Sequence, residues 1–229
     1  IERIIPKLSS IYDEPFADSS QIPSCIISSF SSESVKVLLS GDGGDELFGG
    51  YPRYNKASIQ YRLLNLINYK IRKNFGINGE LLMRREVIRN LMYYSSDSFS
   101  RKILAIYLNK LNRFFYRLVN VQSIEDISRD MNHIWEVSTE TYKNEFENID
   151  LNKDLKKRMM IDDLKVYLPD DLICKMERAS MDSSVELRMP FLDKDIVEFS
   201  LSTPSSIIFN KNQPKYLLKK ILEQYLPKE

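Results

Sequence analysis

One short stretch of the chain gathers the residues best suited to bind a phosphate. It runs from Leu38 to Tyr54, reads LLSGDGGDELFGGYPRY, and holds five of the seven glycines of the chain. Its candidate phosphate-binding residues are one hydroxyl and three glycine amides: Ser40, Gly41, Gly43 and Gly44. Glycine is used where the backbone takes positive φ or approaches a ligand closely. Successive backbone N–H groups form anion-binding nests, so this stretch predicts a phosphate site.

Carboxylates stand inside the same stretch. Asp42 and Asp45 are three residues apart, and Glu46 follows the second. Carboxylates repel a phosphate unless a cation lies between them, which implies Mg²⁺ and a nucleotide. A P-loop is excluded because no Gly-Lys-Ser/Thr follows the glycines, and an EF-hand loop fails on its ligand spacing. A plain glycine turn with solvated acids stays open as the alternative.

A second group of charged residues lies closer to the C-terminus. It comprises Asp170, Asp171, Lys175, Glu177, Arg178, Glu186, Arg188 and Asp193. Asp171 and Lys175 are i,i+4 neighbours on a helix, so exposed ion pairs would explain them. Leu172 and Met176 interrupt the charges, so we expect some of them to be buried, and buried charges are paired and gather at sites. A basic residue there would stabilise charge on a transferred phosphoryl or adenylyl group.

The elements around the glycine stretch suggest how it is positioned. Val35–Leu39 is short, apolar and rich in β-branched residues, which predicts a strand buried on both faces of a parallel sheet. Ile22, Ile26 and Phe30 have helical spacing ahead of it, with candidate N-caps at Asp18 to Ser20. Helix, strand and glycine loop form part of a βαβ unit, where ligands bind at the carboxyl ends of the strands.

The middle of the chain predicts helices without recognisable chemistry. Two apolar stripes have helical spacing: Ile59, Leu63, Leu66, Ile67 and Ile71, then Leu104, Tyr107, Leu108, Leu111, Phe115 and Leu118. We interpret both stripes as core, and the segment of about 55–150 as a helical insertion. The third segment, from about residue 152, also predicts helices.

The totals describe one ordinary globular domain of 229 residues with a net charge of +1. That balance offers no general attraction to nucleic acid or to a membrane surface, so neither is expected as a partner. Cys25 and Cys174 are too few for a disulfide framework and are interpreted as buried free thiols. His133, the one histidine, is interpreted as structural, and neither a zinc site nor a Ser/His/Asp triad is expected. Without a signal peptide or an apolar run long enough to span a bilayer, the expected location is the cytoplasm.

Four segments in a fixed order resemble the glutamine-hydrolysing asparagine synthetases. They are EPFADSSQIPS, SGDGGDELFGGYPRY, YLPDDLICKMERASM and VELRMPFLD, and the middle helical region matches least. The resemblance implies an ATP-dependent ligase with an α/β, mostly helical fold of the adenine-nucleotide α-hydrolase (PP-loop ATPase) type and a short parallel sheet. Its expected cofactors are ATP and Mg²⁺, and its expected partners are aspartate or a similar carboxylate, ammonia derived from glutamine, and a second copy in a homodimer.

The resemblance also implies roles for individual residues. Ser40 and Gly41 would contact the nucleotide, together with Gly43 and Gly44. Asp42 matches a position tied to the acyl-adenylate step, and Asp45 matches a metal-binding acid. Lys175 and Glu186 lie in matching segments, and we expect them to assist catalysis.

Two features of the family are missing from these residues. A Ser-Gly-Gly-x-Asp-Ser loop, which in the family holds the β- and γ-phosphates, does not occur, and no N-terminal cysteine of a glutaminase domain is present. The chain opens in what reads as mid-helix, so residues 1–229 are expected to be a single synthetase-domain fragment that is weakly active or inactive alone. An amidotransferase acting on a sugar or another carboxylate, and a non-catalytic helical interaction module, remain the alternatives.

Overall fold

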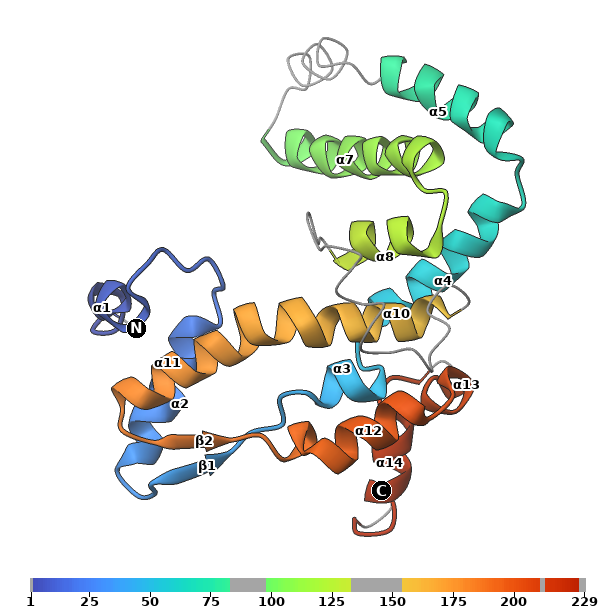
Figure 1. The fold of residues 1–229 in the computed structure, drawn as a ribbon. Coiled ribbons are helices and arrows are strands. Elements are labelled where there is room, and N and C mark those ends of the chain that lie inside the picture. Colours follow the sequence, from blue (N-terminus) through green and yellow to red (C-terminus); the bar gives the residue numbers. More distant parts are fainter. Residues whose placement is uncertain (1, 83–97, 133–153, 211–212, 227–229) are drawn as a thin grey trace.

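The structure is a computed structural model that describes residues 2–82, 98–132, 154–210 and 213–226. Its described part is mostly helical and contains a short parallel sheet, as the sequence predicts (Figure 1). His133 lies outside the described residues. None of the described helices is both long and apolar enough to cross a bilayer.

The sheet is formed by β1 (Val37–Leu39) and β2 (Glu186–Arg188), which run parallel. Val37 lies opposite Glu186, and Leu39 lies opposite Arg188. The prediction of a strand buried on both faces is wrong, because the side chains of Val37 and Leu39 are 39% and 73% exposed. In the described part of the chain only these two strands pair, and no element there covers most of the Leu39 side chain.

The N-terminal elements are η1 (Ile5–Lys7), α1 (Leu8–Tyr12) and α2 (Gln21–Ser32). Tyr12 packs with Cys25 and Ala179 in a small buried cluster, and its hydroxyl donates to the Lys175 carbonyl at 3.1 Å. Cys25 is buried and free, as predicted. Cys174 is also free but only half-buried, so the interpretation of its thiol as buried is wrong.

One long helix crosses the molecule (Figure 1). It consists of α10 (Leu155–Asp162), the π-helical segment η2 (Asp163–Ile173) and α11 (Cys174–Asp182), joined end to end. Asp154 caps its start by accepting a hydrogen bond from the Lys157 N–H at 3.1 Å. Pro169 lies inside η2, and since proline has no N–H it cannot continue an α-helical ladder. Wider π turns are found mainly where a helix is locally adapted, often at functional sites.

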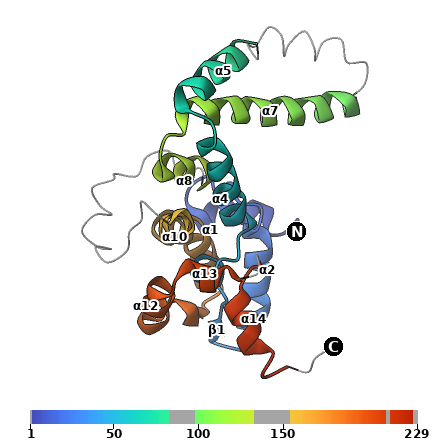
Figure 2. The same cartoon turned by 90° about the vertical axis from the view of Figure 1, so that its right-hand side faces the viewer.

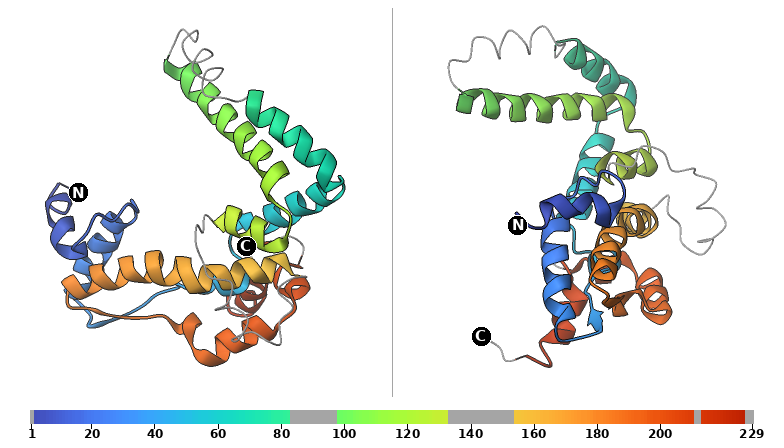
Figure 3. Two further views of the ribbon diagram at one scale, coloured as in Figure 1. Left: turned by 45° about the horizontal axis from the view of Figure 1, so that its top comes forward. Right: turned by 90° about the vertical axis from the view of Figure 1, so that its left-hand side faces the viewer.

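The middle of the chain forms α4 (Pro52–Asn65), α5 (Tyr69–Leu82), α7 (Ser98–Asn120) and α8 (Ile124–Asn132). α5 and α7 lie side by side as a hairpin that extends away from the long helix (Figures 2 and 3). The main apolar core sits at the base of this hairpin. It includes Tyr54, Leu118, Val121, Ile127, Met159 and Met160.

The interpretation of the first apolar stripe as core is wrong. All five of its residues are exposed, and Leu66 is 80% exposed. α4 ends at Asn65 and α5 begins at Tyr69, so the stripe crosses a break between two helices and follows their outer side. In the second stripe Leu108 and Leu118 are buried, whereas Tyr107 and Leu111 are exposed.

The C-terminal elements are η3 (Pro190–Leu192), α12 (Lys194–Ser202), α13 (Ser205–Ile208) and α14 (Tyr216–Leu222). Two hydrogen bonds through Ser200 attach α12 to its neighbouring elements. Lys157 donates to the Ser200 carbonyl, and the Ser200 hydroxyl donates to the Leu47 carbonyl, each at 2.5 Å. These bonds place α12 against α10 and against α3 (Gly44–Phe48), the short helix that follows the glycine loop.

Candidate nucleotide site

The start of the glycine loop is held by two hydrogen bonds. The Ser40 N–H donates to the Arg188 carbonyl at 2.8 Å, which extends the pairing of the two strands by one residue. The Ser40 hydroxyl donates to Oδ2 of Asp42 at 2.5 Å. Between them, a Cβ built on Gly41 would meet no heavy atom within 4 Å. The structure therefore brings Ser40 and Asp42 together around an open stretch of backbone.

Gly43 and Gly44 have a packing role in addition to any contact with a ligand. Gly43 has φ +85°, a conformation that favours glycine. A Cβ there would collide with Leu192, and one on Gly44 would lie 3.2 Å from the Phe191 ring. These two glycines thus let the loop lie against η3.

Asp45, the expected metal ligand, carries an ion pair. Its Oδ2 lies 3.0 Å from Nζ of Lys215, and both side chains are about one-third exposed. Within the described ranges no three His, Cys, Asp or Glu residues cluster so as to hold a metal ion. Mg²⁺ is commonly held by only one or two carboxylates plus substrate phosphates. Asp45 fits that arrangement as a single carboxylate ligand once Lys215 is displaced.

Glu46 is directed into the protein. Its side chain is buried, and it accepts a hydrogen bond from the Tyr51 hydroxyl at 2.6 Å. Burial raises the pKa of Glu46, and the neighbouring carboxylates of Asp45 and Asp42 raise it further, while the Tyr51 hydroxyl opposes the change. Asp42 and Asp45 are therefore close enough to Glu46 to disfavour its ionised form.

A buried ionic cluster lies beyond Glu46, where α4 meets η2. Asp163 is fully buried, and its Oδ2 accepts from the Tyr54 hydroxyl at 2.5 Å and from Arg53 at 2.8 Å. The Arg53 guanidinium stacks over the rings of Tyr51 and Tyr167, 4.1 and 5.3 Å from their centroids. Burial raises the pKa of Asp163 to about 6, although Arg53 and Tyr54 oppose the rise. Oδ1 of Asp163 and Nε of Arg53 are buried and have no hydrogen-bond partner among the residues that the structure describes.

The sequence did not point to this cluster. Asp163 is far from Arg53 in the chain, and helical periodicity does not reveal pairing over such a separation. The available signals were local ones: two adjacent acids, Asp162 and Asp163, after an apolar run, and Pro169 six residues later inside a predicted helix. An ordinary surface helix explains neither feature well, because proline interrupts an α-helix and acids beside apolar residues indicate burial.

Lys175 is buried and pairs with Asp18. Within the described residues Nζ of Lys175 pairs with Asp18 and not with Asp171, its expected i,i+4 partner. Asp18 also accepts from the N–H and the hydroxyl of Ser20, each at 2.8 Å. Burial works against the charged form of Asp18, but the bonds from Lys175 and Ser20 prevail and lower its pKa. Lys175 therefore fixes the segment before α2 onto α11.

Glu186 lies at the beginning of β2 and not at the carboxyl ends of the strands. Its carboxylate pairs with Arg188 at 2.8 Å, and both side chains are more than half exposed. An exposed pair of this kind adds little stability. The structure does not bring Glu186 to the loop in the way that it brings Ser40 to Asp42.

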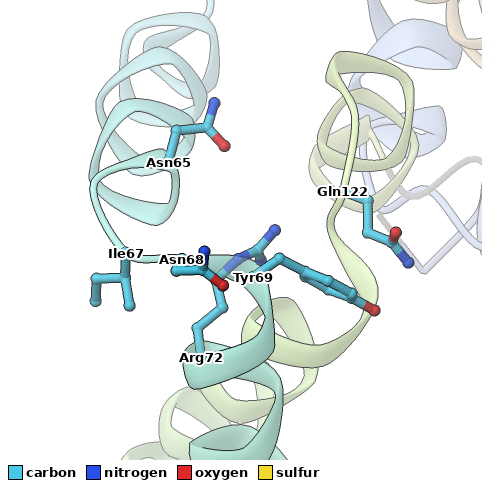
Figure 4. Close-up of a pocket in the computed structure, with 6 residues that line it drawn as sticks. All are labelled: Asn65, Ile67, Asn68, Tyr69, Arg72 and Gln122. Atoms are coloured by element: carbon cyan, nitrogen blue, oxygen red, sulfur yellow. The ribbon is translucent and has the colours of Figure 1, made fainter.

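The described residues also form a polar pocket away from the glycine loop (Figure 4). Its volume is about 320 Å³, and it lies where α4 meets α5. Its lining is Asn65, Ile67, Asn68, Tyr69, Arg72 and Gln122. Arg72 is buried there, and its guanidinium donates to the carbonyls of Leu118 and Val121 at 3.2 and 2.5 Å. The pocket thus marks the joint at the root of the hairpin.

A family model and the curated relatives that match this chain carry similar descriptions. The family model described as Asparagine synthase matches residues 1–229. Asparagine synthetase [glutamine-hydrolyzing] 1 of Bacillus subtilis is 26% identical over 97% of this chain and 33% of its own length. A putative asparagine synthetase [glutamine-hydrolyzing] of Mycobacterium tuberculosis is 26% identical over 97% of this chain and 32% of its own length.

A further relative matches more strongly over a shorter part. The putative asparagine synthetase [glutamine-hydrolyzing] 2 of Methanocaldococcus jannaschii is 56% identical over 44% of this chain and 21% of its own length. The relatives matched along nearly all of this chain are about three times as long, since it spans about a third of them. No solved structure matches the chain.

Proposed function

This chain belongs to the asparagine synthase family, and on that premise we propose that it forms the nucleotide-binding part of an ATP-dependent, amide-forming ligase. The proposed acceptor is aspartate or a similar carboxylate, and the proposed nitrogen donor is ammonia derived from glutamine. The names of the curated relatives, which are glutamine-hydrolysing asparagine synthetases, support both choices.

The proposed reaction has two steps. An oxygen of the acceptor carboxylate attacks the α-phosphorus of ATP, the bond to the bridging oxygen breaks, and pyrophosphate leaves. Ammonia then attacks the acyl carbon, AMP leaves with the bonding electron pair, and the nitrogen loses a proton to give the amide. The protein's task in both steps is to orient the reactants and to stabilise developing negative charge.

The proposed roles follow the geometry of the loop. Ser40 and the N–H of Gly41 would contact the nucleotide, with the amide of Gly43 close behind. The N–H of Gly44 donates to the Gly41 carbonyl at 3.2 Å, so Gly44 would bind the nucleotide only if that bond opens. Asp42 would act at the acyl-adenylate step, held in place by the Ser40 hydroxyl. Asp45 would contribute to binding Mg²⁺, which would neutralise phosphate charge. Lys175 would act by positioning the Asp18 segment. Glu186, which pairs with Arg188 at the start of β2, is assigned no contact with the nucleotide.

A wider fold of the adenine-nucleotide α-hydrolase type is part of the proposal. Its support is the parallel pairing of β1 with β2 and the position of the glycine loop directly after β1. Ligands in open parallel sheets bind at such strand ends. The 229 residues contain no Ser-Gly-Gly-x-Asp-Ser sequence, so we expect them to bind nucleotide without completing adenylation on their own.

One observation carries the proposal: Ser40 and Asp42 are joined across Gly41, whose backbone is open to a ligand. Calorimetric titration with Mg²⁺-ATP and with AMP tests it, on the protein and on Asp42→Ala and Asp45→Ala. We expect binding that depends on Mg²⁺ for ATP and weakens in Asp45→Ala. If neither nucleotide binds and neither substitution changes anything, the chain is a helical interaction module and the proposal fails.

A further inference from the structure

The near-neutral total charge of the chain conceals a strong segregation. Residues 51–120 contain fourteen lysines and arginines against three acidic residues, whereas the whole chain has 33 basic and 32 acidic residues. α7 alone, Ser98–Asn120, has five basic residues and no acidic one. Charge asymmetry of this size indicates an anionic partner, even when the net charge of the chain does not.

Some of these cations have structural partners, and some do not. Arg53 pairs with Asp163, and Arg117 pairs with Asp130. A second set is exposed and has no ion pair with any carboxylate in the described residues. It comprises Lys56, Arg62, Lys70, Lys73, Lys110 and Arg113.

Large apolar side chains are exposed on the same hairpin. Ile71 and Phe75 of α5 are 66% and 62% exposed, and Phe114 of α7 is about half exposed. The rings of Phe75 and Phe114 both contact Phe115, with centroids 6.1 and 5.7 Å apart, so they form one aromatic group on one side of the hairpin.

Cations border these aromatic rings. Nζ of Lys110 lies 5.7 Å from the Tyr107 ring centroid on the outer side of α7, and Tyr107 is itself largely exposed. At the joint with α4, Leu66 and Ile67 continue the exposed apolar surface beside Lys70. We call Ile71, Phe75, Tyr107, Phe114 and the flanking Lys110 and Arg113 the hairpin face.

The hairpin that carries this face projects clear of the body (Figure 3). α5 and α7 project beyond the long helix in all views (Figure 3). At their root Arg72 of α5 donates to the Leu118 carbonyl of α7 at 3.2 Å and to the Val121 carbonyl just after α7 at 2.5 Å. A flat partner can therefore approach the hairpin face without meeting the glycine loop.

We propose that the hairpin face docks on an anionic lipid surface. Basic helices with Phe, Tyr, Ile and Leu beside Lys and Arg lie in the membrane interface, where the apolar groups enter the acyl boundary and the cations meet headgroup phosphates. A nucleic acid would bind the cations and stack on the aromatic rings, but it would offer no favourable contact to the exposed side chains of Ile71, Leu66 and Ile67. The expectation of no membrane partner rested on the total charge, and this inference departs from it. It is independent of the proposed ligase activity.

Vesicle co-sedimentation tests the inference. The protein is mixed with phosphatidylcholine vesicles that contain either no phosphatidylglycerol or about one-third of it, at low and at high salt. We expect binding to the anionic vesicles only, weakened by salt. Lys110→Gln with Arg113→Gln should lower the partition coefficient about 25-fold, at roughly fivefold per cation. Phe75→Ser with Phe114→Ser should lower it several-fold without changing the salt dependence.

Matched controls come from the same chain. Lys219→Gln with Lys220→Gln removes two exposed cations from α14, and Phe30→Ser removes an exposed ring from α2. Neither should alter binding, and circular dichroism should show every variant folded.

Four outcomes would overturn the inference. The first is absence of binding, and the second is equal binding to neutral vesicles. The third is an equal loss of vesicle binding in the Lys219→Gln, Lys220→Gln control. The fourth is tighter binding to a double-stranded RNA or to a second copy that is unaffected by the Phe substitutions.

Discussion

Lys215 Nζ lies 3.0 Å from Oδ2 of Asp45, so the carboxylate expected to bind a metal is already paired with a cation of the same chain. The pair is partly exposed, and such pairs contribute about 1 kcal/mol or less. A Mg²⁺ ion can therefore displace Lys215 at modest cost. The pairing offsets the charge of Asp45 in the absence of ligand and makes Lys215 a competitor of the metal.

Lys215→Gln should raise the affinity for Mg²⁺ in the presence of nucleotide by up to about fivefold, because the competing cation is gone. Isothermal titration of Mg²⁺ at saturating ATP measures it, and Lys219→Gln serves as the control. A fall in nucleotide affinity would instead show that Lys215 contacts phosphate, contrary to this interpretation.

Gly41→Ala should leave the stability unchanged, since the added methyl group meets nothing within 4 Å. It should still weaken AMP binding, because it shields the backbone that we assign to the nucleotide. Gly49→Ala is the matched contrast. Gly49 has φ +67°, and its added Cβ would lie 2.5 Å from the Phe209 ring, so this substitution should destabilise by about 1–3 kcal/mol. Urea unfolding and calorimetry separate the two effects, and unaltered AMP binding by Gly41→Ala would contradict the assignment.

Tyr54→Phe should destabilise the protein by about 1–3 kcal/mol, because buried Asp163 loses a hydrogen bond and keeps only Arg53. Tyr61→Phe, on the same helix and packed against the same core, has no such partner in the described structure and should change stability by less than about 0.5 kcal/mol. Equal effects of the two substitutions in urea unfolding would argue against a structural role for the Asp163 bond.

The stability of the protein should depend on pH through Asp163. Its pKa is raised from 3.8 to about 6 in the folded state, so the folded protein binds this proton more tightly than the unfolded chain does. The free energy of unfolding should then fall as pH rises from about 4 to about 6, by up to about 3 kcal/mol.

Asp163→Asn should remove that part of the pH dependence. Urea unfolding of wild type and variant at pH 4, 5, 6 and 7 measures the difference, with exposed Asp170→Asn as the control. A difference that stays constant with pH, or that grows in the opposite direction, would show that Asp163 is ionised throughout this range.

The parts of the structure that sequence reasoning reached are those with local signals. The open turn at Gly41 could be predicted from the dense run of glycines and acids. The parallel pairing of β1 could be predicted from the order of helix, strand and glycine loop. Cys25 was expected to be buried because its neighbours are apolar, and it is.

The parts that it missed depend on contacts between distant residues. Asp163 with Arg53, Lys175 with Asp18 and Lys215 with Asp45 each join separate regions of the chain. Periodicity identified the stripe from Ile59 to Ile71 but could not tell whether another element covers it. The register of η2 was equally hidden, since a π-helical segment shifts which residues share a face.

The long helix from Leu155 to Asp182 has a mechanical consequence. Near one end it carries Asp163, which is linked through Arg53 and Tyr51 to Glu46 in the loop, and near the other it carries Lys175, which holds Asp18. The Asp163 cluster and the Lys175–Asp18 pair are thus attached to one continuous helix. The wider turns around Pro169 lie between Asp163 and Lys175, so they determine how much of a rotation at one group reaches the other.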